Sequence, residues 1–264
     1  MKFAILSDIH GNIEALEACM KIIDEIKVDE LIWCGDFVTD MPNANDVINL
    51  IKEYKNKYNS HIIKGNREKY ILDFEDGKYP EWKENGRFSN IVRTFKSLSK
   101  ENLIWIRDLP DELEIKCENK TICVSHTGKT SLVGDIQIFG HEHNQFYFIK
   151  NGITYINPGS VGITLDEGKD IFAQFIILEV TDRIQKIDCY NIKYDYQKTL
   201  YSLREVEEYY KNYRWEMICE KVITDKKDYT LEIISEYDRL RKEKSIINES
   251  LELWNDAIKK IMKK

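Results

Sequence analysis

The sequence from Lys2 to Asn12, KFAILSDIHGN, decides the fold of this chain. Its largely apolar run, Lys2 to Leu6, predicts a buried strand. The strand leads directly into Asp8 and His10, and glycine at the next position permits a tight turn. Apolar side chains then recur every three or four positions, as in an amphipathic helix, at Ile13, Leu16, Met20, Ile23 and Ile26. Strand, polar turn and helix together form the repeating unit of a layered α/β domain.

The same unit returns twice along the chain. Leu31 to Cys34 is a short strand candidate that ends at Gly35-Asp36, and Val47 to Tyr54 reads as the helix after it. His61 to Lys64 is a third strand candidate and ends at Gly65-Asn66. The next segment, up to residue 109, is mostly helical in pattern. Further strands are predicted at Leu113–Cys117, Thr121–Ser125, Ile136–Phe139, Gln145–Ile149, Ile153–Ile156, Ile171–Val180 and Ile184–Ile192.

The composition is that of a globular protein, with 42% hydrophobic and 32% charged residues in 264. A net charge of -7 argues against non-specific binding to nucleic acid. No apolar run approaches the length that spans a bilayer, so we expect no membrane association and a cytoplasmic protein. The six cysteines form no C-x-x-C pair and are predicted to be reduced. Only Cys117 and Cys123 could face each other across a hairpin.

The composition changes near residue 196, where a second segment is predicted to begin. From Thr199 to Lys264 there is neither Gly nor Pro, which indicates helices. We therefore divide the chain into a domain over 1–195 and a helical extension over 196–264. Apolar residues keep an approximate heptad that is broken at Lys244: Ile233, Tyr237, Leu240, Ile247, Leu251, Trp254, Ile258 and Ile261. An amphipathic helix covering the body is the main interpretation, and a homodimer seam is the alternative.

Four of the five histidines lie in short turns that also contain Asp, Asn and Gly. Side chains two positions apart at a strand end leave on the same side, so Asp8 and His10 can converge, as can His141 and His143. Imidazole and carboxylate groups suit transition metals better than calcium. Asp36 is the best candidate to bridge two ions. The candidate ligands are Asp8, His10, Asp36, Asn66, His126, His141 and His143. His61 lies within a strand and is assigned a structural role.

Two divalent ions balanced by few carboxylates would form a positive centre that attracts a phosphate. The helix N-terminus after Gly11-Asn12 favours an anion in the same way, which makes Asn12 a candidate substrate contact. Manganese is the favoured metal, with iron, zinc, nickel or cobalt as alternatives. The expected partner is therefore a small phosphorylated substrate.

These motifs resemble the calcineurin-like metallophosphoesterase superfamily. Its pattern is Asp-x-His, Gly-Asp, Gly-Asn-His-Asp/Glu, His, and Gly-His-x-His. The opening SDIHGNIEAL and the later stretch from Asn157 to Gly162, NPGSVG, resemble its small bacterial and archaeal phosphodiesterase branch. Proteins of that branch are often labelled diadenosine tetraphosphatase or serine/threonine phosphatase-like. The resemblance covers roughly Met1 to Val180.

The resemblance implies a fold, a metal centre and a reaction. The fold would be a four-layer αββα sandwich of two mixed sheets, followed here by the helical extension. A bridging hydroxide would attack phosphorus while Asn66 and Arg67 hold the phosphoryl oxygens. The turn from Asn157 to Gly162 would support the histidine loops. Carried over by position, one metal would take Asp8, His10, Asp36 and His143, and the other Asp36, Asn66, His126 and His141.

One position departs from the family pattern, because Arg67 stands where the family usually has a histidine that is often assigned as the general acid. An arginine binds phosphate oxygens but keeps its proton, so it is a poor acid. We therefore expect a preference for acidic leaving groups, such as those of aryl phosphodiesters, over alkyl monoesters. The alternative is that Arg67 pairs with Glu68 or another carboxylate at the rim.

Three functions remain open on the sequence alone. The leading one is a dinuclear-metal phosphoesterase acting on a small phosphodiester or nucleotide. A serine/threonine-type protein phosphatase is the second, and it would need an extended groove. The third is a non-catalytic protein-binding scaffold on the same fold, as in the retromer subunit that resembles these enzymes. All seven ligand types are present, which favours catalysis over the scaffold. Any cover over the site would come from the segment between Tyr70 and Trp105 or from the helical extension.

Overall fold

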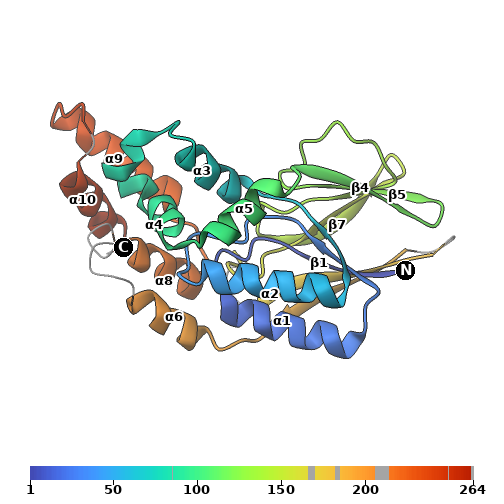
Figure 1. Cartoon of the computed structure of the whole chain (residues 1–264). Coiled ribbons are helices and arrows are strands. Elements are labelled where there is room, and N and C mark those ends of the chain that lie inside the picture. Colours follow the sequence, from blue (N-terminus) through green and yellow to red (C-terminus); the bar gives the residue numbers. More distant parts are fainter. Residues whose placement is uncertain (85, 166–169, 182–184, 206–213, 249, 263–264) are drawn as a thin grey trace.

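Two mixed five-stranded sheets lie face to face in the computed structural model, with helices along one side and at one end (Figure 1). The structure describes residues 1–84, 86–165, 170–181, 185–205, 214–248 and 250–262. The first sheet has the strand order β10-β9-β1-β2-β3. Its strands are β1 (Lys2–Leu6), β2 (Glu30–Trp33), β3 (Asn59–Ile62), β9 (Ala173–Val180) and β10 (Gln185–Ile192). Among the described residues, no helix is long and apolar enough to cross a membrane.

The first sheet is built from the repeated unit seen in the sequence. Strands β1, β2 and β3 are parallel, and helices α1 (Ile13–Ile26) and α2 (Ala44–Lys57) connect them. Alternate side chains of β1 point to opposite faces of the sheet. Ala4 therefore packs in the core beneath the helices, and Phe3 packs in the core between the two sheets. Strand β9 then adds antiparallel to β1, which makes the sheet mixed.

The second sheet has the order β4-β5-β6-β8-β7 and contains the predicted strands. They are β4 (Glu112–Cys117), β5 (Lys120–Ser125), β6 (Ile136–Ile138), β7 (Gln145–Lys150) and β8 (Ile153–Pro158). The β4–β5 register places Cys117 opposite Lys120 and Cys123 opposite Glu114, so these two cysteines do not face each other. All six cysteines are free thiols, as expected.

The α/β class with two mixed sheets is confirmed, but one predicted layer is different. In the described ranges, helices lie along the first sheet and none covers the outer face of the second (Figure 1). Strand β7 on that sheet exposes Tyr147, Phe148 and Ile149. The physical reason is chain length, because only ten residues, His126 to Asp135, join the parallel strands β5 and β6. A crossover helix needs a longer connection.

The segment after β3 forms a helical excursion. Its elements are α3 (Asn66–Glu75), the short turns η1 (Pro80–Glu84) and η2 (Gly86–Phe88), α4 (Ser89–Ser97) and α5 (Lys100–Asp108). Trp82 is buried and stacks on Phe74 and Phe88, with ring centroids 6.4 Å and 4.3 Å away. These aromatic side chains are part of the core beneath the helices.

The extension forms helices α6 (Tyr196–Arg204), α8 (Trp215–Asp225), α9 (Thr230–Glu243) and α10 (Leu251–Met262). The prediction of one covering helix was wrong, because the chain leaves helix at Lys244 and α10 returns beside α9. Helices α8, α9 and α10 lie at the end of the molecule near α4, and α6 lies beside α1 (Figure 1). Most of the heptad side chains, including Ile233, Trp254 and Ile258, are buried in a core within this one chain. The part of the predicted helical tail at residues 206–213 lies outside the described residues.

Candidate metal centre

The predicted polar turns meet where strand ends of both sheets come together. Asp8 and His10 follow β1, Asp36 follows β2, and Asn66 begins α3 after β3. The second sheet contributes His126 after β5 and the pair His141 and His143 after β6. Residues from position 8 to position 143 thus lie in two adjoining groups of possible metal ligands.

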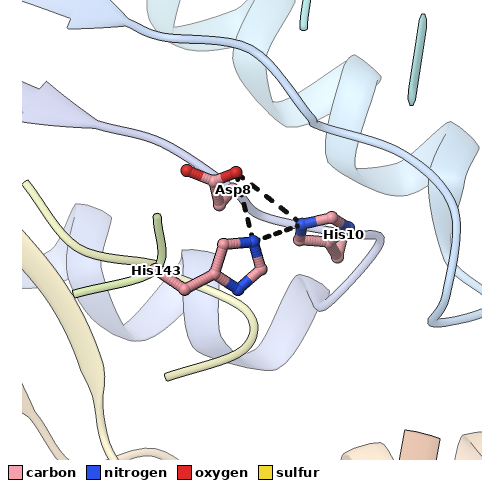
Figure 2. A group of neighbouring side chains, drawn as sticks. All are labelled: Asp8, His10 and His143. Carbon is pink, nitrogen blue, oxygen red and sulfur yellow. Dashed lines mark hydrogen bonds and ion pairs between the residues drawn. The ribbon is translucent and has the colours of Figure 1, made fainter. Parts of the chain in front are cut away.

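The first group is Asp8, His10 and His143, whose ligand atoms all lie within 4.8 Å of one another. Figure 2 shows the three side chains pointing toward one another, Asp8 and His10 from the turn after β1 and His143 from a second turn. His10 Nε2 is 3.1 Å from His143 Nε2, and His143 Nε2 is 3.3 Å from Asp8 Oδ1. Asp8 and His10 are buried, and the His143 side chain is 15% exposed. Solvent therefore reaches this group mainly at His143.

The second group is Asp36, His126 and His141, which meet the same 4.8 Å limit. His126 Nε2 is 3.3 Å from Asp36 Oδ2. Asn66 Oδ1 lies between two imidazoles, 2.9 Å from His126 Nε2 and 3.0 Å from His141 Nδ1. Asp36 Oδ2 is also 3.9 Å from His10 Nε2 in the first group. The carboxylate of Asp36 therefore stands between the two groups.

Partners behind three of the histidines fix the direction of their rings. The Nδ1 atom of His126 is 2.7 Å from the carbonyl oxygen of Cys34, and that of His143 is 2.8 Å from the carbonyl oxygen of Ile163. His10 Nδ1 is 2.7 Å from Asp40 Oδ2. Each acceptor holds a proton on Nδ1, which leaves the Nε2 lone pair facing the centre.

This arrangement fits divalent cations. Lone pairs of His10 and His143 face each other at 3.1 Å, and those of His126 and the Asn66 amide oxygen at 2.9 Å. Asp8 Oδ1 is buried without a hydrogen-bond partner. A cation or a proton between such atoms removes their mutual repulsion, and imidazole with carboxylate oxygen is a donor set for transition metals.

The backbone of the site adopts the left-handed conformation at five of the predicted ligands. Their φ angles are 55° at Asp8, 52° at His10, 54° at Asp36, 69° at His141 and 56° at His143. This conformation costs a residue with a Cβ atom about 1–2 kcal/mol. Hydrogen bonds to the carbonyls of neighbouring turns hold it, for example from the Asp8 N–H to Gly35 and from the His10 N–H to Asp36. Strain of this kind clusters at functional sites.

Gly65 allows the Asp36 carboxylate to lie where it does. A Cβ atom at Gly65 would lie 2.2 Å from Asp36 Oδ1 and 2.4 Å from the Asp36 nitrogen. Gly140 is restricted in the same way, because a Cβ atom there would lie 1.9 Å from Ser7 Oγ. These glycines permit the close approach that the sequence motif suggested.

The charges in the site act strongly on its imidazoles. Burial opposes protonation of His10, but the neighbouring carboxylates of Asp40 and Asp8 outweigh it and raise the pKa of His10 to about 9. Burial also opposes protonation of His126, while the charge and hydrogen bond of Asp36 raise its pKa to about 10. The pKa of His141 is lowered, chiefly by burial. Protons and metal ions therefore compete for the same ring nitrogens.

Two buried carboxylates that the sequence did not single out support the site. Asp40 accepts a hydrogen bond from Asn90 Nδ2 at 2.7 Å, and its other oxygen is 2.7 Å from His10 Nδ1. Glu68 accepts backbone N–H groups of Asp36, Phe37 and Gly65 at 2.7–2.9 Å. The available signal was their place in the motifs, since Asp40 lies four residues after Asp36 and Glu68 is the acid of the Gly-Asn-x-Glu turn.

Arg67 lies at the wall of the cavity beside the metal-binding groups. Its guanidinium Nη2 is 3.5 Å from Asp40 Oδ2, and its backbone N–H donates to Asp36 Oδ1 at 2.7 Å. The charge of Arg67, acting against burial, helps to hold the pKa of Asp40 well below its usual range. Of the two sequence interpretations, the carboxylate pairing is present, with Asp40 as the partner in place of Glu68. The side chain is still 30% exposed and borders the cavity.

Asn12 does not reach the cavity, which corrects its assignment as a substrate contact. Its side chain is fully buried, and its amide oxygen accepts the N–H of Ala15 as the cap of α1. The amide group donates to the carbonyl of Gly162, and Thr199 Oγ1 donates to the Asn12 oxygen at 3.0 Å. Every polar atom of this side chain thus has a structural partner.

The turn from Asn157 to Gly162 lies beneath the ligand loops, as predicted. Asn157 Nδ2 donates to the carbonyl of Gly140 at 2.8 Å, and Ser160 Oγ donates to the carbonyl of Asp8 at 2.6 Å. His61, assigned a structural role, pairs with Glu30 at 2.7 Å on strand β2.

A cavity of about 510 Å³ opens beside the two groups and reaches helices α8 and α9. Its lining includes His10, Asp36, Asn66, His141 and His143. The cover over the site thus comes from the extension, one of the two sources expected from the sequence. Another cavity, of about 530 Å³, lies among α1, α2 and α6 and is bordered by none of the predicted ligands.

Comparison with known proteins agrees with this geometry. Residues 1–183 match the model of the calcineurin-like phosphoesterase superfamily domain. A phosphodiesterase of Methanocaldococcus jannaschii is 26% identical over 169 residues, which are 60% of this chain and 83% of that protein. An uncharacterised protein of the same organism is 27% identical over 226 residues, 74% of this chain and 88% of that protein.

The fold also matches a solved structure. The metallophosphoesterase of Sphaerobacter thermophilus aligns with a TM-score of 0.61 at 20% identity, covering 78% of this chain and 94% of that one. At this identity the likeness concerns the fold alone. The assignment to a family rests on the match over residues 1–183. Membership identifies the protein as a metal-dependent phosphoester hydrolase, and the family implies divalent metal ions. The chain belongs to the calcineurin-like phosphoesterase superfamily.

Proposed function

We propose that this protein is a dinuclear-metal phosphodiesterase that hydrolyses a small phosphodiester or nucleotide. The observation that carries the proposal is the pair of adjoining ligand groups, with Asp36 between them. One ion would be held by Asp8, His10, Asp36 and His143, and the other by Asp36, Asn66, His126 and His141. Bound there, two divalent ions, with manganese as our first choice, would supply Lewis acidity and a water acidic enough to act as a nucleophile near neutral pH.

The protein's own groups would bind and orient the substrate. The Arg67 guanidinium borders the cavity and is fixed by Asp40 at 3.5 Å, so it can hold phosphoryl oxygens without further ordering. Asn66 borders the same cavity through its amide, and its N–H groups can donate to a phosphoryl oxygen. Asp40 would keep the His10 ring turned toward the centre, because its oxygen lies 2.7 Å from His10 Nδ1.

The shape of the cavity favours a small substrate over a phosphoprotein. The extension forms one wall, through Trp215, Ile218 and Val222 of α8. A volume of about 510 Å³ suits a molecule of nucleotide size. A protein phosphatase would need an extended groove, and a wall beside the metal groups shortens any such path. This favours the small diester over the protein phosphatase among the functions that the sequence left open.

Asp36→Asn provides the direct test. The purified protein is assayed on an aryl phosphodiester, an alkyl monoester and a phosphopeptide, with manganese, nickel, zinc or iron added. We expect hydrolysis of the aryl diester, and its loss in Asp36→Asn, because the amide cannot place a negative charge between the groups. Hydrolysis of the phosphopeptide alone would favour a protein phosphatase. No hydrolysis of any phosphoester would favour the scaffold.

A further inference from the structure

The cavity beside the metal-binding groups is lined by two chemically different sets of side chains. One set is polar and consists of the imidazoles, Asp36, Asn66 and the Arg67 guanidinium, with Asp40, Glu142, Asp228 and Thr230. The other set is apolar and consists of Ile163, Leu165, Trp215, Ile218, Val222 and Leu231. We call these six side chains the apolar wall. A molecule that fills this cavity therefore needs an anionic end and a hydrophobic end.

The apolar wall comes mainly from a part of the chain outside the family match. Trp215, Ile218 and Val222 belong to α8, and Leu231 to the first turn of α9, whereas the match ends at residue 183. The wall is thus an addition that this chain makes to the shared domain.

The α8 side chains of the apolar wall are held in place without a ligand, because other side chains of the extension pack against them on the side away from the cavity. Ile218 and Val222 are buried in the core of the extension with Ile258 and Trp254. The Trp215 indole N–H donates to the carbonyl of Gly86 at 2.7 Å, which anchors α8 to the excursion. A preformed surface binds without first losing conformational entropy.

Two acidic side chains at the cavity decide the charge of what can bind there. Asp228 and Glu142 are exposed and belong to its lining. The Asp228 charge acts on Arg67, where it opposes the effect of burial and contributes to raising the pKa of that guanidinium. Beyond the metal groups and Arg67, a second anionic group would meet negative charge. An uncharged substituent meets no such repulsion.

We infer that the apolar wall is a specificity subsite for an uncharged, apolar substituent of the phosphoester, an alkyl or aryl group. This inference rests on the proposed function, since the phosphate must bind at the ligand groups. It narrows the substrate class from small phosphodiesters in general to those with a hydrophobic ester group. Substrates with several phosphates in a row are disfavoured.

The test uses ligands that have no acidic leaving group. Inorganic phosphate and methyl, ethyl, propyl and butyl phosphate are measured as ligands of the manganese-loaded protein by calorimetry. They are also measured as competitive inhibitors of aryl diester hydrolysis. Each methylene buried against the wall should raise the affinity by about fourfold. Because affinity and not turnover is compared, leaving-group acidity plays no part in this series.

Two variants connect the series to the wall. Leu231 is 75% exposed, so Leu231→Ala leaves the core intact and should reduce the gain in affinity per methylene. Val222→Phe adds volume and should weaken butyl phosphate while leaving inorganic phosphate nearly unchanged. The matched control is Ile104→Ala, an aliphatic side chain on α5 that is 62% exposed and does not line the cavity. Circular dichroism checks that each variant is folded.

The outcomes separate the two claims. If affinity is independent of alkyl length while the aryl diester is still hydrolysed, the subsite is refuted and the proposed function stands. If Ile104→Ala changes the series as much as Leu231→Ala does, the wall is not the cause and the inference fails. If the folded protein neither binds inorganic phosphate nor hydrolyses any ester, both claims fail together. A rising series that both wall variants flatten supports the subsite.

Discussion

At the scale of single residues, Arg67 has the most direct consequence for the choice of substrate. Arg67 is the second residue of helix α3, borders the cavity and lies 3.5 Å from Asp40. A guanidinium can bind a phosphoryl group but cannot donate its proton to a leaving group at any physiological pH. The preference for good leaving groups, expected from the sequence, therefore stays a prediction.

We predict that Arg67→His raises alkyl monoester hydrolysis relative to aryl diester hydrolysis. A histidine there can act as a general acid, a contribution of about 10²–10⁴-fold when the leaving group is poor. The measurement is kcat/KM for both substrates in wild type and variant. Arg67→Gln is the control, since it removes the charge without supplying an acid and should lower both rates. A parallel change of both rates in Arg67→His would contradict the argument.

We further predict that Asp40→Asn weakens manganese binding by about 10–100-fold, the usual cost of losing a group that orients a metal-bound histidine. Asp40 holds His10 Nδ1 at 2.7 Å, and the Arg67 charge keeps the pKa of this buried carboxyl well below its usual range. The affinity is measured by competition with a chelator. Asp188→Asn is the control, because that side chain pairs with Lys186 on β10 and should leave the affinity unchanged. Equal affinities in Asp40→Asn and wild type would show that His10 needs no such support.

The residues that the sequence identified are those whose chemistry is visible in short local motifs. Asp8, His10 and Asp36 stand in glycine-rich turns after strands, and the structure brings them together. Asp40 was missed because nothing local shows that it lies behind His10. Asn12 was assigned to the substrate from its place before a helix, but a helix N-terminus can equally be closed by its own cap. Burial, which only the tertiary structure gives, decides between the two.

At the scale of elements, the loops after the strands tolerate little change. Gly65 directly precedes α3, and its hydrogen atom faces the Asp36 carboxylate. We predict that Gly65→Ala displaces Asp36, because a Cβ atom would lie 2.2 Å from its Oδ1. Aryl diester hydrolysis and manganese binding should both be lost while the far-ultraviolet spectrum stays native.

Gly77→Ala is the matched control for this prediction. Gly77 has a φ of 72° but open space around it, so alanine there adds backbone strain without a clash. Its expected cost is about 1–2 kcal/mol of stability with full activity. If both variants lose activity equally, the contact with Asp36 is not the cause of the loss in Gly65→Ala.

The strands and the first helices were predictable because their patterns are local. Strand β1 matches its predicted range, and β2 and β3 are each displaced by one or two residues. The arrangement of the extension was not predictable in this way. Its heptad residues indicate an apolar face, but the pattern does not say whether that face packs on a second chain or folds back. The return of α10 beside α9 within one chain depends on contacts between distant positions, such as Lys260 with Glu236 at 2.8 Å.

At the scale of the whole molecule, the site links the two sheets. The first sheet provides Asp8, His10 and Asp36, and the second provides His126 and His143. A cation held between them joins the strand ends of both sheets. Stability, metal binding and pH are therefore coupled in this protein.

We predict that chelator-treated protein loses stability as the pH rises. The pKa values of His10 and His126, raised to about 9 and about 10, exceed the unfolded value of about 6.5. Their protonation contributes stability that is complete below about pH 6.5 and disappears as the pH rises through those folded values. Added manganese should reverse the trend, because the ion replaces protons that leave more readily at high pH. Thermal unfolding across this range, with and without manganese, tests both slopes.

The left-handed backbone has a consequence for how such sequences change over time. Positions 8, 10, 36, 141 and 143 exclude β-branched residues whether or not a metal binds, because few side chains accept that conformation. A descendant that had given up hydrolysis would go on selecting small polar residues or glycine there. These five positions alone are therefore a weaker marker of activity among relatives than the complete set of seven ligands. His126 and Asn66, which do not have a positive φ, are under no such backbone constraint and are the more informative positions to compare.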